Sequence, residues 1–224
     1  MNNGIAQRIN DIKSRLPEGV TLVAVSKFHP DEAIMQAYNA GHRVFGESRA
    51  VELTGKAERL PKDIEWHFIG HLQTNKVRAI LPHVKLIHSV DSERLLRFIS
   101  AEALRIGTVA DVLLQLHVAA EETKFGFTPD ELIQLAKSGV INDLNGVRVR
   151  GVMGMASNTD DENRINADFS AIRATFDKLI SECGFNPDSC NIVSMGMSHD
   201  YPIAIRCGGN MVRIGTTIFG EREY

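Results

Sequence analysis

The sequence predicts an α/β protein built as one TIM-like (β/α)8 barrel with an extra helix at its N-terminus. Short β-branched runs alternate with longer helical runs along nearly all of the 224 residues. The strand runs are apolar without strict alternation, which is typical of parallel strands covered by helices. Eight strand and helix units suit one domain of this length and leave no room for a second sizeable one.

The first element is an amphipathic helix over residues 2–16. Ile5, Ile9 and Ile12 follow one another at helical intervals of three and four residues, and Pro17 stops the pattern soon after. We therefore expect a leading helix ahead of the barrel, within a single domain that spans residues 1–224.

Eight strand runs follow, each with a helical run behind it. The expected strands are 20–26, 43–46, 65–70, 85–90, 109–118, 147–155, 191–196 and 210–215. The helical runs that follow them are 30–41, 48–60, 73–81, 92–107, 128–139, 161–184, 199–208 and 216–220. An open doubly wound sheet is the alternative, but no G-x-G-x-x-G follows the first strand and no P-loop is present, which favours the barrel.

Composition narrows the classes of function. The formal net charge is −3 and the basic residues are scattered, so nucleic acid is not an expected partner. The sequence has no run of about 18 apolar residues and no apolar stretch near its start, which predicts a cytoplasmic protein that needs no membrane. Cys183, Cys190 and Cys207 never form C-x-x-C, which favours reduced thiols over a disulfide framework.

Lys27 is the first candidate for chemistry because it follows the first strand at the end where barrels build their sites. With a period of two it shares a face with Val23 and Val25, so it points inward if Val25 does. A lysine partly removed from water has a lowered pKa, and its neutral amine can attack an aldehyde. The alternative is a lysine that extends to the rim or pairs with Glu47.

Two turns rich in small residues follow the last two strands, SMGMS at 194–198 and RIGTTIFG at 213–220. Their glycines, the hydroxyls of Ser194 and Thr216, and the starts of short helices can bind a phosphate, where barrels frequently bind one. Either turn alone could be an ordinary tight connection. Arg213, two residues before Gly215, would lie beneath this phosphate site and could donate to a ring nitrogen, or it could pair with a carboxylate at the barrel mouth.

Six segments in this order resemble the pyridoxal phosphate homeostasis protein family: VAVSKFHP, FGES, WHFIGHLQTNK, KFGF, SMGMS and MVRIGTTIFG. The resemblance spans nearly the whole chain. It implies a fold type III barrel like the N-terminal domain of alanine racemase, with pyridoxal 5′-phosphate (PLP) held as a Schiff base on Lys27. The other implied contacts are Ser48, His71, Ser194, Met195, Gly196, Arg213, Gly215 and Thr216. Many members read FGEN, so Ser48 replaces an amide in this chain.

The expected role is intracellular PLP (vitamin B6) homeostasis without efficient catalysis, with no catalytic residue assigned. Free amino acids and apo PLP enzymes are the further candidate partners, and a monomer is expected because no apolar stripe is left over. The alternative is a PLP-dependent amino-acid racemase with weak activity, which needs a second base opposite Lys27. Tyr38, Tyr201 and Tyr224 offer no obvious second base, and the sequence ends shortly after the eighth strand.

A metal-dependent hydrolase is a second rival interpretation. His29, His67, His71 and His88 lie near strand ends, where barrel metalloenzymes gather their ligands. His67 and His71 do not share a helix face, and no acidic residue falls at ligand spacing, so polar residues at the rim are the favoured interpretation. No metal is therefore expected.

Overall fold

The computed structural model describes residues 4–120 and 125–220, and its strands form a closed barrel in the order β1 to β8. All neighbouring strands pair in parallel, and β1 closes the sheet against β8, with Thr21 opposite Met211 and Ala24 opposite Ile214. This confirms the predicted barrel and excludes the open sheet. Residues 2 and 3 of the predicted first helix, Lys124 of KFGF and Tyr224 lie outside the described ranges.

Each predicted strand run forms a strand. Their bounds are β1 Thr21–Val25, β2 Val44–Glu47, β3 Glu65–Phe68, β4 Val84–Val90, β5 Ala110–Leu116, β6 Val147–Gly154, β7 Ile192–Ser194 and β8 Met211–Ile214. Most strands end one or more residues before the runs do, because the last residues of these runs turn toward the following helix. Most of the candidate site residues lie between strand and helix, whereas Ser194 and Arg213 lie within β7 and β8.

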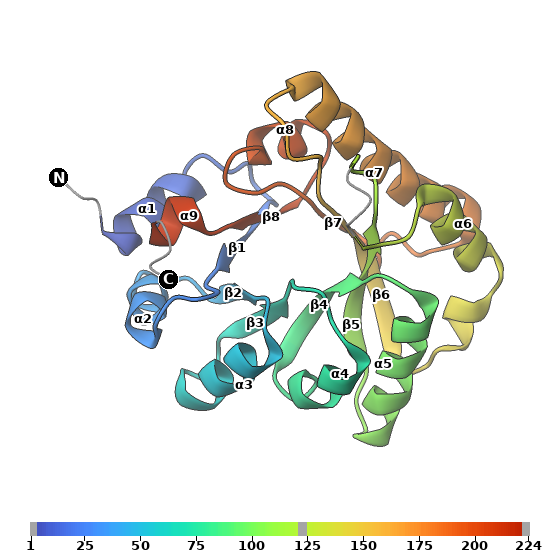
Figure 1. Ribbon diagram of the computed structural model, residues 1–224, viewed down its shortest axis with the longest axis horizontal. Helices are drawn as coiled ribbons and strands as arrows, with labels where there is room; N and C mark the ends of the chain where they lie inside the picture. The colour runs from blue at the N-terminus through green and yellow to red at the C-terminus, as the bar shows by residue number, and fades with distance from the viewer. Residues whose placement is uncertain (1–3, 121–124, 221–224) are drawn as a thin grey trace.

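The helices surround the strands, as Figure 1 shows. They are α1 Ile5–Lys13, α2 Asp31–Asn39, α3 Ala50–Arg59, α4 Thr74–Ile80, α5 Glu93–Arg105, α6 Pro129–Lys137, α7 Glu162–Cys183, α8 Tyr201–Arg206 and α9 Thr216–Phe219. A 3-10 turn, η1 Val140–Asp143, was not predicted. Within the described ranges, no helix combines the length and the apolar character needed to cross a bilayer.

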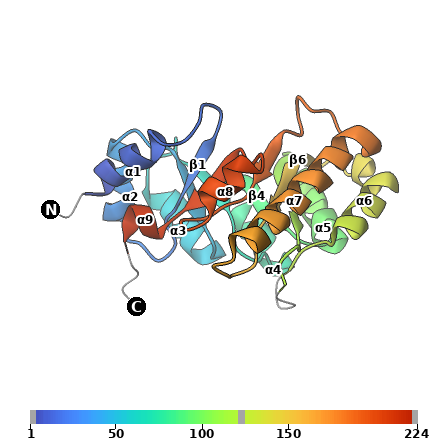
Figure 2. The same cartoon turned by 90° about the horizontal axis from the view of Figure 1, so that it is seen from above.

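The first helix is shorter than predicted but packs as its pattern requires. Ile5, Ile9 and Ile12 are buried along one face of α1, which contacts both α2 and α9. Figures 1 and 2 both show α1 beside α9, so the first and last helices of the described chain meet next to the seam between β1 and β8. A long-range hydrogen bond from the Arg8 side chain to the Ile218 carbonyl reinforces this contact.

The interior of the barrel changes character along its axis. An apolar layer near the strand starts consists of Val23, Leu86, Leu113, Met153 and Met211. Side chains on a strand return to the same face every second residue. Two residues farther along these chain segments stand Val25, His88, Gln115, Met155 and Arg213. The barrel interior is therefore apolar at the bottom and polar toward the ends where a site is expected.

Candidate cofactor site at the ends of the strands

A cavity of about 230 Å³ opens at the carboxyl ends of the strands. Its lining comes mainly from the segments that follow β1, β2, β7 and β8, on both sides of the seam that closes the barrel. The lining residues are Val25, Lys27, His29, Ser48, Ile69, Met155, Met197, Ser198, His199, Arg213, Gly215, Thr216 and Gly220. None of these described residues is acidic, so the cavity presents basic and hydroxyl groups to a ligand.

Lys27 lies in the turn directly after β1, half-buried, and lines this cavity together with Val25. The predicted face shared by these two residues is thus the cavity face. Glu47, the carboxylate considered as a partner for this lysine, instead accepts hydrogen bonds from Lys56 and Ser26. The neighbouring His29 stacks on Phe219 with ring centroids 4.9 Å apart, which joins the β1 turn to α9.

Arg213 forms the charged floor of the cavity. Only 5% of its surface is exposed, and its guanidinium donates to the Ser194 hydroxyl at 2.6 Å and to the Gly154 carbonyl at 3.0 Å. Burial lowers its pKa to about 10, so it stays protonated at neutral pH. No carboxylate among the described residues forms an ion pair with it. A buried cation of this kind favours an anionic or electron-rich ligand.

A buried hydrogen-bonded chain continues from Arg213 into the barrel. The Ser194 hydroxyl lies 3.0 Å from Nδ1 of His88, and Nε2 of His88 lies 2.9 Å from Nδ1 of His67. Burial lowers the pKa of His67 to about 3 and that of His88 well below its usual value, so both rings are neutral. Because arginine can only donate, the simplest order of donors is Arg213 to Ser194, Ser194 to His88, and His88 to His67.

The two small-residue turns take different places in the site. Gly215 and Thr216 line the cavity directly, and a Cβ at Gly215 would lie 3.2 Å from the Val25 carbonyl oxygen, which leaves little room for any side chain. Ser194 and Met195 are fully buried behind the cavity wall. Gly196 has φ +92°, and a Cβ there would lie 2.6 Å from that of Ala204, so glycine is required for this turn.

Ser48 and His71 were both expected near the ligand, and the structure separates them. Ser48 lines the cavity, at the residue after β2. His71 lies in a neighbouring hollow after β3, where its ring bonds Asp91 at 2.9 Å and stacks on Phe125 with centroids 4.0 Å apart. The structure therefore brings Lys27, Ser48, Arg213, Gly215 and Thr216 together and leaves His71 outside.

Several lining residues were not singled out from the sequence, among them Ser198 and His199. Ser198 is the last residue of the SMGMS motif and His199 directly follows it, so extending the motif by one residue would have included both. Of the four histidines of the metal interpretation, His67 and His88 bond each other inside the barrel, whereas His71 contacts Asp91 and His29 stacks on Phe219. Across residues 4–120 and 125–220, no group of three or more His, Cys, Asp and Glu side chains could hold a metal ion.

Known proteins are similar to this chain in sequence and in fold. The family described as alanine racemase, N-terminal domain, matches residues 3–223. The pyridoxal phosphate homeostasis protein of Aquifex aeolicus is 38% identical over 224 residues, covering 98% of this chain and 96% of that one. The Schizosaccharomyces pombe protein of the same name is 37% identical over 206 residues, covering 91% of this chain and 84% of that one.

Solved structures give the same result. PipY of Synechococcus elongatus without PLP superimposes with a TM-score of 0.90 at 36% identity, covering 96% of this chain and all of that one. The same protein with PLP bound gives 0.86 at 35% identity with equal coverage. An alanine racemase of Clostridium difficile, at 17% identity and a TM-score of 0.79, covers 99% of this chain and 56% of that one, and shares the fold.

The closed barrel, with its basic cavity at the strand ends, defines a protein of the alanine racemase N-terminal domain class. Within that class, the chain belongs to the pyridoxal phosphate homeostasis protein family. The resemblance found in the six sequence segments is thereby confirmed.

Proposed function

We propose that this chain binds PLP in the cavity at the strand ends, attached through the Lys27 amine, and serves in PLP homeostasis. The observation that carries the proposal is the pairing of a half-buried lysine with a buried arginine on one cavity without acidic lining residues. The names of the family relatives and the PLP-bound PipY structure support it.

The residues present fit this ligand. The phosphate of PLP is an anion that needs N–H and O–H donors, which Thr216, Ser198 and the backbone around Gly215 offer. The pyridine nitrogen needs a donor, and Arg213 is a permanent one in the cavity floor. The volume of about 230 Å³ is below the usual range for drug-sized ligands, as suits a compact cofactor.

When bound, PLP supplies an aldehyde that condenses with a primary amine. The residues of this chain hold the cofactor and limit the reactions open to it. Lys27 contributes the amine, and the hydroxyl and backbone donors would orient the phosphate. A charged Arg213 facing the ring nitrogen keeps that nitrogen unprotonated, which weakens the ring as an electron sink. This arrangement favours retention of the cofactor over carbanion chemistry.

The direct test is a titration of the protein with PLP followed by borohydride reduction and peptide mass spectrometry. We expect a visible absorbance band and one modified lysine, Lys27, with both lost in Lys27→Ala. Lys178→Ala, at an exposed lysine on α7, serves as the matched control and should bind as the wild type does. Modification at another lysine, or a full band in Lys27→Ala, refutes the proposed attachment.

The proposed homeostasis role involves partners besides PLP, and a second experiment tests them. We propose that the chain exchanges PLP with apo PLP enzymes and lets free amino acids react at the open cavity without fast turnover. PLP should pass to an apo-enzyme faster than free release allows. Racemisation of amino acids at an ordinary enzymatic rate of about 1 to 1,000 per second would instead support the racemase alternative.

We propose further that the protein acts as a cytoplasmic monomer. The three cysteines are free thiols, which suits a reducing compartment. The large apolar side chains exposed in the described ranges fall in four separate parts of the chain: Phe28, Val51, Leu104 with Ile106 and Val109, and Phe125. Sedimentation with and without PLP tests the oligomeric state, and a dimer in either condition would contradict it.

A further inference from the structure

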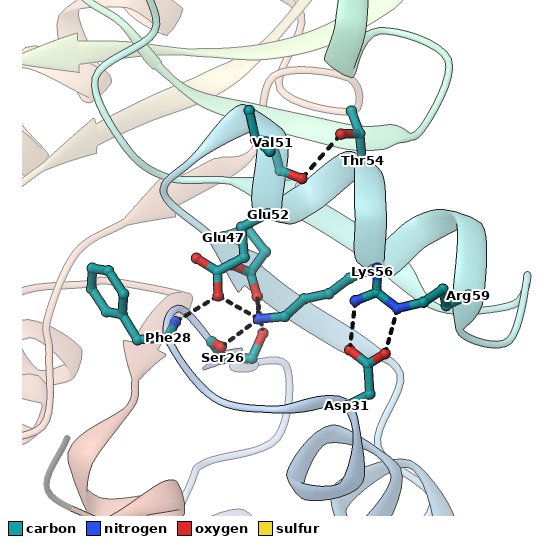
Figure 3. Close-up of polar contacts among 9 residues, drawn as sticks. All are labelled: Ser26, Phe28, Asp31, Glu47, Val51, Glu52, Thr54, Lys56 and Arg59. Carbon is teal, nitrogen blue, oxygen red and sulfur yellow. Dashed lines mark hydrogen bonds and ion pairs between the residues drawn. The ribbon is translucent and has the colours of Figure 1, made fainter. Parts of the chain in front are cut away.

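A buried cluster of charges lies directly behind the turn that carries Lys27 (Figure 3). It consists of Glu47 at the end of β2 and of Glu52 and Lys56 on α3, and we call it the Lys56 clamp. Glu47 is fully buried and Lys56 is 3% exposed. The clamp is distinct from the cavity lining, because none of its three residues borders the cavity.

Lys56 uses all three of its ammonium protons within this cluster. Its Nζ donates to the Ser26 carbonyl at 2.9 Å, to Glu47 Oε1 at 2.8 Å and to Glu52 Oε1 at 2.7 Å. An ammonium group has three donors and no acceptor, so its hydrogen-bonding capacity is filled. One of the three bonds goes to the backbone of the residue directly before Lys27.

The carboxylates hold the other side of the same turn. Glu52 Oε1 accepts the backbone N–H of Phe28 at 2.6 Å, and Glu47 Oε1 accepts the Ser26 hydroxyl at 2.6 Å. The clamp therefore bonds the backbone on both flanks of Lys27. Farther along α3, Arg59 forms a bidentate pair with Asp31 at the start of α2, at 2.7 and 3.1 Å.

The turn needs such support because its backbone is strained. Phe28 has φ +67°, the one positive value among the described residues other than glycine. In this left-handed region a side chain crowds its own backbone, and such conformations persist where the surroundings impose them. The Phe28 side chain is 37% exposed and contacts the Arg49 guanidinium. The hydrogen bond to Glu52 restrains its backbone N–H.

Stability alone does not explain the clamp. Burying an ion pair removes both charges from water, and apolar side chains of similar size are often as stabilising. Glu47 also leaves its Oε2 without a hydrogen-bond partner in the described structure, which adds to the cost of burial. Apolar replacements could fill the same space, but they could not bond Ser26 and Phe28 on either side of Lys27.

We propose that Glu47, Glu52 and Lys56 are positioning residues, which hold the strained turn at 26–28 so that the Lys27 amine stays directed at the cavity. This role rests on the proposed function of the cavity as a PLP site. It predicts that loss of the clamp weakens the bond to Lys27 without weakening the noncovalent contacts of the ligand.

Two ligands separate these effects: PLP, and pyridoxine 5′-phosphate, which carries an alcohol in place of the aldehyde. Glu52→Leu removes the acceptor for the Phe28 N–H at a site where the side chain is 19% exposed. We expect PLP to bind about tenfold more weakly, or ~1.4 kcal/mol, and pyridoxine 5′-phosphate to change by less than about twofold. Glu58→Leu, an exposed site on the same helix, is the matched control. Glu52→Gln keeps an acceptor oxygen and should restore most of the affinity.

A second variant removes the cation. Lys56→Met together with Glu47→Gln removes both fully buried charges and leaves Glu52, whose side chain is 19% exposed, as the remaining carboxylate. This pair is therefore the one expected to fold, as far-UV circular dichroism would check. It should show the same selective loss of PLP affinity as Glu52→Leu. If these variants bound both ligands more weakly to the same extent, the cavity itself would be damaged. If their PLP affinity were unchanged, the clamp would be dispensable. Either result overturns the proposal.

A rescue experiment examines the backbone itself. Glycine adopts positive φ without the usual crowding, whereas alanine does not. In the Glu52→Leu background, Phe28→Gly should therefore bind PLP several-fold more tightly than Phe28→Ala, and equal affinities would contradict the role of the strained turn.

A wild-type protein that binds neither ligand refutes the function proposed for the cavity. A wild type that binds PLP no better than Glu52→Leu refutes the clamp alone.

Discussion

At the scale of single residues, Arg213 shows how burial sets the chemistry of the cavity. Its guanidinium is held by the Ser194 hydroxyl and the Gly154 carbonyl, two neutral acceptors that do not cancel its charge. A carboxylate in the same place would neutralise that charge and would make the cavity floor less attractive to a ligand's acceptor atoms. Because both partners are neutral, the Arg213 guanidinium keeps a positive charge that can attract a ligand.

Arg213→Met should therefore weaken PLP binding. Hydrogen bonds to a charged group contribute about 1.5–3 kcal/mol, which corresponds to a loss of roughly 10- to 100-fold in affinity. Spectrophotometric titration measures this change. Arg206→Met, at an exposed position on α8, is the control and should leave the affinity unchanged. An Arg213→Met protein with wild-type affinity would remove this arginine from the site.

The buried histidines make the fold sensitive to acid. The pKa of His67 is about 3 in the folded protein and near 6.5 in an unfolded chain, so the unfolded chain takes up the proton first. The contribution of the neutral His67 ring to the unfolding free energy is fully present above pH 6.5 and is lost as the pH falls from 6.5 toward 3. Glu47 acts in the opposite sense, because burial raises its pKa to about 7 and stability from it falls as the pH rises toward 7.

His67→Gln isolates the contribution of this histidine, since Glu47 is the same in both proteins. Between pH 7.5 and pH 5 the wild type should lose ~2 kcal/mol more unfolding free energy than the variant does. Urea unfolding at the two pH values measures the difference. Parallel losses in the two proteins would show that His67 titrates normally.

At the scale of elements, the eight strands and the helices behind them followed from periodicity and from β-branched composition. The places of Lys27, Arg213 and Gly215 at strand ends also followed, because strand ends converge in any barrel. What the sequence could not reveal is distance across the barrel. His67, His88 and Ser194 come from three strands, and nothing in the spacing of these residues predicts that their side chains bond one another.

The Lys56 clamp illustrates the same limit. In the sequence, Glu52 and Lys56 form an ordinary i, i+4 pair, of the kind that usually lies on a solvated helix face. Their burial depends on how α3 packs against the turn after β1, which is a tertiary property. The left-handed backbone at Phe28 is likewise invisible, because phenylalanine is not a residue that signals positive φ.

Helix α6 offers a test of local sequence signals. Thr128 and Glu131 form a complete capping box, in which the Thr128 hydroxyl accepts the Glu131 N–H and the Glu131 carboxylate accepts the Thr128 N–H. Thr128→Ala removes one half of it and should lower the unfolding free energy by about 1 kcal/mol. Ser181→Ala, at an exposed site within α7, should change it by less than about 0.5 kcal/mol. Urea unfolding measures both changes. Equal changes in the two variants would show that the capping box has no specific stabilising role.

At the scale of the whole molecule, the site depends on closure of the barrel. Lys27 follows β1 and Arg213 lies in β8, and these two strands become neighbours when the ends of the sheet pair. Helix α1 packs beside this seam and contacts both α2 and α9. The cavity is therefore assembled by contacts between the two ends of the described chain, and it should be lost whenever that seam opens.

We propose that residues 1–224 fold as one domain that unfolds in a single transition. Trp66, the one tryptophan in the sequence, is buried in β3, while Ile9 is fully buried in α1 beside the seam. Ile9→Ala should cost about 2–5 kcal/mol, whereas Gln7→Ala on the exposed face of α1 should cost little. In one cooperative unit, Ile9→Ala shifts the urea transition seen by Trp66 fluorescence and by far-UV circular dichroism to the same extent. A fluorescence transition that stays at the wild-type midpoint while the dichroism shifts would show that α1 unfolds separately from the barrel.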